Sequence, residues 1–147
     1  MKLQDFLVKA HKATYASGKE PKKNNQEADQ YVYQEDKYEY IDSYFGAEYF
    51  VGIEVVKESG KVVWGMNYYG RYAANKKYNE EFPPFLKKML SKTKAGILVR
   101  GPKSYKEKEW SYRYVYKGAF NNFTAKEVIK YKGKKIFEAV LAGGNIK

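Results

Sequence analysis

The sequence contains no cysteine, one histidine and only four prolines in 147 residues. Without cysteine the chain offers no disulfide, no thiolate zinc site, no iron–sulfur cluster and no cysteine nucleophile. The single histidine, His11, excludes sites built from several histidines, and no signature supplies it with an orienting acid or a nucleophile. No glycine-rich phosphate loop opens a helix. We therefore expect no metal, no cofactor and no enzymatic activity.

Long hydrophobic runs are also missing. No segment approaches the roughly 18 consecutive apolar residues that a membrane helix requires, and the N-terminus lacks the apolar core of a signal peptide. We therefore expect a soluble, cytoplasmic protein without a membrane partner. The length suits a single domain over residues 1–147, and the 44% hydrophobic content, which includes 16 Tyr and 8 Phe, is enough to build a core.

The hydrophobic pattern predicts two helices and seven strands. Apolar residues recur at helical spacing over 3–14 and 85–93, where Gly18 and Gly96 are plausible stops. The polar stretch 18–30 is predicted to be a loop. Strand-like segments follow, with turns at 59–60 and 132–133: they are 31–33, 38–41, 50–56, 61–69, 110–116, 123–131 and 134–141.

The two halves of the chain resemble each other. Residues 50–72 and 123–145, which are 73 apart, share seven identities in 23 positions, where average usage gives about one or two. The helices align at an offset of 79, and 38–41 aligns with 112–115 at an offset of 74. The alternative is that any two hairpins of Val, Lys and Gly look alike. We predict pseudo-repeats of about 1–72 and 78–147, each helix–strand–strand–strand, that form an α+β fold with two main helices on an antiparallel sheet of about six or seven strands.

Charge is distributed unevenly. Residues 25–60 hold nine acids and two bases, whereas 61–147 hold twenty bases and six acids. A basic face could bind nucleic acid through phosphate contacts, and its candidate residues are Lys87, Lys88, Lys92, Lys94, Lys130, Lys132, Lys134 and Lys135. The alternatives are an ordinary solvated surface, or self-association between the acidic first half of one copy and the basic second half of another.

The segment 64–72 contains the candidate ligand site. In strand geometry Trp64, Met66 and Tyr68 share one face, which we expect to lie in the core. Polar and aromatic side chains on the other face, Asn67, Tyr69 and Arg71, could bind a small molecule or a peptide end together with Arg100. The candidate site comprises these four residues and Trp64 from the core face. Cross-strand pairing and turn hydrogen bonds are the alternative explanation for these residues.

Two carboxylates occupy equivalent positions in the proposed repeats. Glu54 and Glu127 could act as an acid and base pair if they shared one cleft. Each is flanked by valine on a predicted strand, however, where a glutamate often faces solvent. We therefore expect these two residues to be structural.

Several runs of the sequence together carry a family resemblance: they are Thr14-Tyr15-Ala16, Tyr44-Phe45-Gly46, the stretch from Trp64 to Gly70, Arg100-Gly101-Pro102, Phe123 with Glu127 and Gly133, and Gly143-Gly144-Asn145-Ile146. On these residues the chain resembles a bacterial and archaeal family of small domains of unknown function, some of which follow an Xre-type helix-turn-helix domain. Because a helix-turn-helix portion is absent here, the resemblance implies an accessory or sensing domain. Our leading hypothesis is a non-enzymatic binding or sensing domain associated with transcription regulation, and direct nucleic-acid binding is the alternative.

Overall fold

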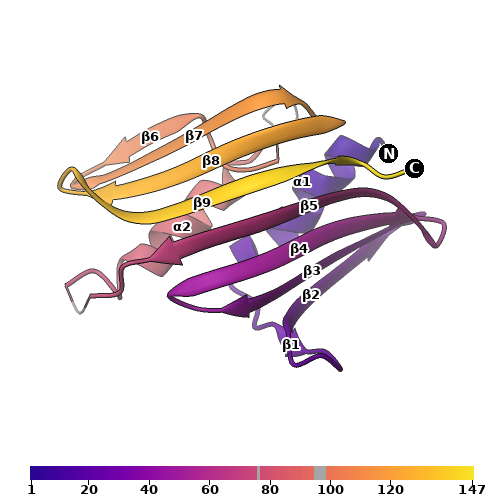
Figure 1. Ribbon diagram of the computed structural model, residues 1–147, viewed down its shortest axis with the longest axis horizontal. Coiled ribbons are helices and arrows are strands. Elements are labelled where there is room, and N and C mark those ends of the chain that lie inside the picture. The colour runs from indigo at the N-terminus through magenta and orange to yellow at the C-terminus, as the bar shows by residue number, and fades with distance from the viewer. Residues whose placement is uncertain (76, 95–98) are drawn as a thin grey trace.

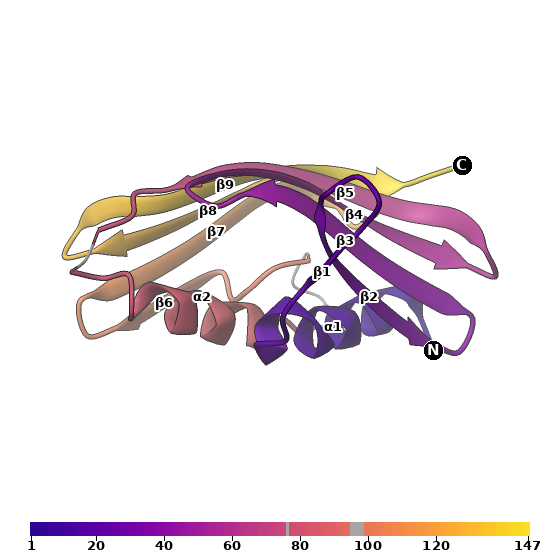
Figure 2. The same ribbon diagram turned by 90° about the horizontal axis from the view of Figure 1, so that it is seen from below.

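The computed structural model describes residues 1–75, 77–94 and 99–147. In these residues one antiparallel sheet has nine strands in the order β1-β2-β3-β4-β5-β9-β8-β7-β6 (Figure 1). The sheet is strongly curved, and both helices lie beneath its concave face (Figure 2). The elements are α1 (Leu3–Ala13), β1 (Lys22–Lys23), β2 (Asp29–Glu35), β3 (Tyr38–Gly46), β4 (Tyr49–Glu58), β5 (Lys61–Tyr72), α2 (Phe82–Ser91), β6 (Ser104–Glu107), β7 (Trp110–Ala119), β8 (Asn122–Tyr131) and β9 (Lys134–Asn145), with a 3-10 turn at Tyr15–Ser17.

The expected α+β fold, with two main helices on a sheet of six or seven strands, is wrong. The sheet has nine strands, and the structure is 54% strand and 17% helix with two short helices. The two strands that were not predicted, β1 and β6, lie at the edges of the sheet in polar, lysine-rich sequence. Short, charged edge strands are common because they discourage pairing with other chains. Their sequences show no hydrophobic alternation, so the sequence pattern did not predict them.

The second helix ends earlier than predicted. The predicted stop Gly96 lies outside the described residues, and α2 ends at Ser91.

The two hairpins at the centre of the sheet have matching registers. The β4–β5 ladder shifts between Val56 and Lys57, and the β8–β9 ladder shifts between Ile129 and Lys130, 73 residues later. For β3 and β7, however, the ladders correct the predicted offset. Residues 38–41 correspond to 110–113, an offset of 72 rather than 74, because Tyr40 lies opposite Val56 whereas Tyr112 lies opposite Ile129. These matches support the repeat, which stays a prediction about the origin of the fold.

The two helices are held to the sheet by matching contacts. Each helix has an exposed ion pair and a stacked ring pair to the sheet at equivalent positions: Lys9–Glu35 at 2.6 Å and Phe6–Tyr38 at 5.1 Å between centroids for α1, and Lys88–Glu107 at 2.7 Å and Phe85–Trp110 at 5.2 Å for α2. In α2, Phe82 also stacks on Tyr72 at 4.1 Å. Exposed ion pairs contribute at most about 1 kcal/mol each. Burial of the aromatic rings therefore contributes most of the stability of these anchors.

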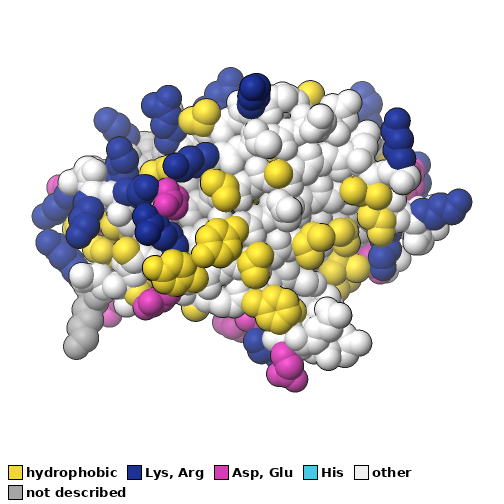
Figure 3. All heavy atoms as spheres, in the orientation of Figure 1, with side chains coloured by type: hydrophobic (Ala, Val, Ile, Leu, Met, Phe, Trp, Pro, Cys, Tyr) yellow, Lys and Arg dark blue, Asp and Glu magenta, His cyan; other side chains and the backbone are white. Residues whose placement is uncertain are grey.

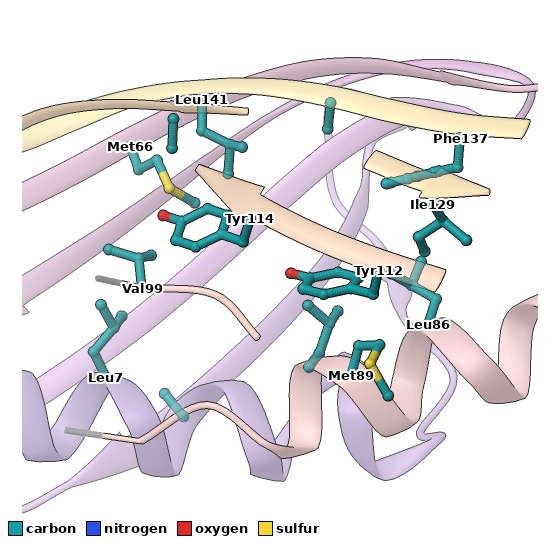
Figure 4. Packing of buried hydrophobic residues seen from close by; sticks show 14 of the residues in the cluster. Leu7, Met66, Leu86, Met89, Val99, Tyr112, Tyr114, Ile129, Phe137 and Leu141 are labelled. Carbon is teal, nitrogen blue, oxygen red and sulfur yellow. The ribbon is translucent and has the colours of Figure 1, made fainter. Parts of the chain in front are cut away.

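The core lies between the concave face and the helices. Leu86 and Met89 extend from α2 toward the sheet, where Tyr112 and Ile129 are close by (Figure 4). Trp64 and Met66 are buried, as predicted from the alternation of β5. Tyr68 is half-buried and packs against the same core.

Gly143 is a position where backbone atoms leave no room for a side chain. A Cβ here would lie 2.5 Å from the carbonyl oxygen of Gly65 and 2.9 Å from the Cα of Met66, across the β5–β9 junction. We expect Gly143→Ala to lower the free energy of unfolding by about 1–3 kcal/mol, as measured by urea denaturation, because the ladder must shift. The control is Gly65→Ala, whose Cβ would meet its nearest atom at 3.4 Å. Equal stability of the two variants would contradict the close approach.

Candidate functional site

A cavity of about 390 Å³ lies between the concave face and the helices, on the side of the first half of the chain. Much of its lining is aromatic, and includes Tyr40, Tyr44, Phe50, Tyr68, Phe82 and Phe137. Five Asp, Glu, His or Arg side chains line the same space: His11, Asp29, Asp42, Glu54 and Arg100. A cavity of this size with a mainly apolar lining and a few polar groups is typical of small-molecule sites.

Glu54 is held by a histidine from the first helix. The Nε2 atom of His11 lies 2.7 Å from Oε2 of Glu54, and the glutamate is only 1% exposed. Burial acts to raise the pKa of Glu54, but the charges of His11 and Arg100, with hydrogen bonds from His11 and Tyr40, lower it further than burial raises it. Glu54 is therefore a buried carboxylate.

Arg100 lies between the equivalent glutamates of the two halves. Its Nη2 atom donates to Oε1 of Glu127 at 2.9 Å, and its Nη1 atom lies 4.0 Å from Oε1 of Glu54. Tyr112 completes the arrangement by donating its hydroxyl to Oε2 of Glu127 at 2.5 Å. Burial acts to lower the pKa of Arg100, but the charges of both glutamates and the hydrogen bond to Glu127 raise it well above its ordinary value. One guanidinium thus joins two buried carboxylates.

Neither glutamate faces solvent, as a valine-flanked glutamate on a strand often does, since Glu127 is 0% exposed and Glu54 is 1% exposed. That both are structural stays a prediction. The pattern of β8 contains a signal that could have shown the burial of Glu127. Glu127 lies two residues after Ala125 and two residues before Ile129, so the three side chains share one face of the strand, and Ala125 and Ile129 are both buried. The partner Arg100 could not be inferred, because it comes from a segment 27 residues away.

Asp42 was not singled out by the sequence, and it is the one acid of the cavity wall without an ion pair among the described residues. It lies opposite Glu54 on the β3–β4 ladder and is 7% exposed. Its Oδ1 atom accepts a hydrogen bond from Tyr68 at 2.7 Å, and no ion pair involves it among the described residues. Burial and the nearby charge of Glu54 raise its pKa to about 7, although the hydrogen bond from Tyr68 acts to lower it.

The five residues of the sequence-based candidate site do not meet in one place. Trp64 is inside the core, where its Nε1 atom donates to the carbonyl oxygen of Phe120 at 3.1 Å. Three residues are exposed on the opposite face of β5: Asn67, Tyr69 and Arg71. The Nε atom of Arg71 donates a hydrogen bond to Oε1 of Glu138 at 3.1 Å. Of the five, Arg100 alone lines the cavity. Binding by the other four stays a prediction.

The candidate lysines are partly engaged within the chain. Lys88 pairs with Glu107 and Lys135 pairs with Glu138, while Lys87 and Lys92 lie over tyrosine rings. On the outer face of the sheet, Lys and Arg side chains are densest at the left end of the view and others lie at the right end, while hydrophobic side chains cross the middle (Figure 3). Contact with nucleic acid through Lys87, Lys88, Lys92, Lys94, Lys130, Lys132, Lys134 and Lys135 stays a prediction, as does self-association between unlike halves.

In residues 1–75, 77–94 and 99–147, no three His, Asp or Glu side chains gather in a way that could hold a metal ion. Within the same described ranges, neither helix has the length and apolar character needed to cross a bilayer.

Comparison with known proteins identifies a family for most of the chain. Residues 42–146 match the model of DUF5680, a domain of unknown function, and this range contains Asp42, Glu54, Arg100 and Glu127. No curated protein and no solved structure matches the chain. Because the matched range covers well over half of the sequence, the chain belongs to the DUF5680 family of domains of unknown function.

Proposed function

We propose that this protein is a small-molecule-binding domain whose ligand occupies the cavity between the curved sheet and the two helices. The observation that carries the proposal is the cavity of about 390 Å³ with its aromatic lining and its five Asp, Glu, His or Arg side chains. The family resemblance further supports a role in sensing, as a domain accessory to transcription regulation. Direct nucleic-acid binding is the alternative, and binding that persists at physiological salt would favour it.

The energetics of the cluster support a functional role. Charged groups in a core must give up hydration, so a core of aliphatic residues would often be equally or more stable. Ionisable groups with shifted pKa values, lining a cavity, are typical of functional sites.

Binding is favoured over catalysis because most of the cluster is already engaged. Arg100 is bonded to Glu127, and His11 is bonded to Glu54. Asp29 is paired with Lys23, so Asp42 is the one Asp, Glu, His or Arg side chain of the cavity wall without an ion pair among the described residues. General acid–base catalysis commonly uses two groups that can exchange protons with a substrate.

The test blocks the cavity with a bulky side chain at its rim. Ala47, an exposed residue after the end of β3, lines the cavity, and Ala47→Trp should obstruct it. The matched control is Ala119→Trp: Ala119 is the exposed residue that follows Gly118, as Ala47 follows Gly46, and it does not line the cavity. Both glycines have positive φ, 91° and 100°. A thermal-shift screen of a metabolite library should be run on the wild type and both variants.

We expect compounds that raise the melting temperature of the wild type and of Ala119→Trp but not of Ala47→Trp. At a ligand concentration of about 100 times Kd, the stabilisation should be about 2.7 kcal/mol. Compounds that stabilise all three proteins equally would place the site elsewhere. If nothing in the library stabilised the wild type, the proposal would be overturned.

A further inference from the structure

We infer that the ligand carries a protonated amine, which pairs with the carboxylate of Asp42 while its carbon skeleton lies against the aromatic lining. This inference rests on the proposed ligand-binding role of the cavity. It follows from three observations: the charges left unmatched in the cavity wall, the placement of Asp42 in the sheet, and the aromatic side chains beside it.

The acids of the cavity wall differ in their partners. Asp29 pairs with the Nζ atom of Lys23 at 2.9 Å, and Glu54 pairs with His11 at 2.7 Å. Asp42 has no ion pair among the described residues, and its Oδ2 atom accepts no hydrogen bond from them. One carboxylate of the wall thus has no cation.

The bases of the wall cannot supply that cation. Arg100 is directed to Glu127 by hydrogen bonds from Nη2 at 2.9 Å and Nε at 3.4 Å, and His11 is bonded to Glu54. When Asp42 is ionised, the buried cluster therefore holds three carboxylates against Arg100 and, at most, one protonated histidine. An incoming cation would remove this excess of negative charge, whereas an incoming anion would find Arg100 already bonded.

The sheet itself does not require an acid at this position. Asp42 lies directly opposite Glu54, and like charges opposite each other on neighbouring strands are destabilising. In the second half, the residue directly opposite Glu127 is Tyr114, a buried aromatic residue. The same architecture therefore accommodates a neutral side chain there, and the carboxylate appears only in the half that forms the cavity.

Aromatic side chains surround the carboxylate. Tyr40 and Tyr44 are two residues before and after Asp42 on β3, so they share its face, and both line the cavity. Ring faces attract ammonium groups, more strongly when water is excluded. Farther along the lining, Phe137 stacks on Phe50 at 5.7 Å and contacts Phe82 at 5.4 Å between centroids. An amine with an aryl or alkyl body matches this combination.

The test compares three probes with the same skeleton: 4-phenylbutylamine, 4-phenylbutan-1-ol and 4-phenylbutyrate. Calorimetric titrations at pH 8 keep Asp42 ionised, because its pKa is about 7, and keep the amine protonated. We expect the amine to bind the wild type at least about tenfold more tightly than the alcohol, and the carboxylate to bind most weakly. In Asp42→Asn the amine and the alcohol should bind equally, with the affinity for the alcohol unchanged.

The matched control is Asp29→Asn, which removes an acid of the same cavity that is already paired with Lys23. This variant should keep the preference for the amine. Equal binding of amine and alcohol by the wild type, or preference for the carboxylate, would overturn the inference and leave the cavity as a binding site of another specificity. A preference retained in Asp42→Asn, or failure of the amine to bind the wild type, would overturn it too. The library screen separately decides whether the cavity binds ligands at all.

Discussion

Replacing Arg100 with methionine should lower the free energy of unfolding by about 3–5 kcal/mol, the largest effect expected of any substitution considered for this protein. Methionine fills much of the same volume but removes the guanidinium that joins the two buried glutamates. Glu127 would then keep the hydroxyl of Tyr112 and lose its only ion pair among the described residues. Urea denaturation of the wild type and the variant at pH 7 measures the effect.

Two further variants separate the loss of charge pairing from the loss of packing. Arg71→Met removes an exposed arginine paired with Glu138 and should change the free energy of unfolding by at most about 1 kcal/mol. Adding Glu127→Gln to Arg100→Met removes the unpaired carboxylate, so the double variant should be more stable than Arg100→Met alone. The contrary result would be a double variant whose loss in free energy of unfolding equals the sum of the losses of Arg100→Met and Glu127→Gln. That result would show that the guanidinium acts through packing alone.

Asp42 should make the protein less stable as the pH rises from about 4 to about 7. Its pKa is 3.8 when unfolded and about 7 when folded, so between these values the folded state binds more protons than the unfolded state. The free energy of unfolding therefore falls as the pH rises through this range. The difference between the two pKa values of Asp42 corresponds to a total loss of about 4 kcal/mol. Glu54 acts in another window: its lowered pKa adds stability that is lost only as the pH falls below its ordinary value of 4.5.

Asp42→Asn isolates this contribution, because asparagine does not titrate. The groups that face Asp42 remain in the variant, namely Glu54, Arg100, His11 and Tyr68. Relative to the wild type, the variant should therefore gain stability steadily between pH 4 and pH 7, in urea denaturation curves recorded at each pH. Tyr68→Phe removes the hydrogen bond that lowers the pKa of Asp42, and should extend the same window to higher pH. Parallel curves for wild type and Asp42→Asn would contradict the raised pKa.

Local patterns predicted those parts of the fold that depend on neighbouring residues. The alternation of β5 indicated that Trp64 and Met66 are buried, and the turn glycines placed the two central hairpins. The offsets of 73 and 79 between the halves also recur in the ladder shifts and in the helix anchors. Edge strands β1 and β6 have no such pattern, because their pairing depends on the strand beside them.

The site could be predicted only in part, because its chemistry comes from partners far apart in the sequence. His11 reaches Glu54 across 43 residues, and Tyr68 reaches Asp42 across 26. Arg100 was named as a candidate, yet of its expected companions on β5 Trp64 lies in the core away from the cavity lining. The other three, Asn67, Tyr69 and Arg71, face the other side of the sheet. Alternation along a strand indicates which neighbouring residues lie on the same face as a glutamate. It does not indicate whether solvent or a buried arginine covers that face, because the fold decides which segment packs there.

A carbon-detected NMR titration of the Asp42 side-chain carboxyl in the free protein tests most directly whether the cavity holds a buried carboxylate without its cation. The geometry, with Glu54 opposite and Tyr68 as the sole hydrogen-bond donor among the described residues, predicts a midpoint at about pH 7. A midpoint near 4, as for an aspartate in water, would show that Asp42 is already solvated or neutralised and would contradict the assigned role of the cavity.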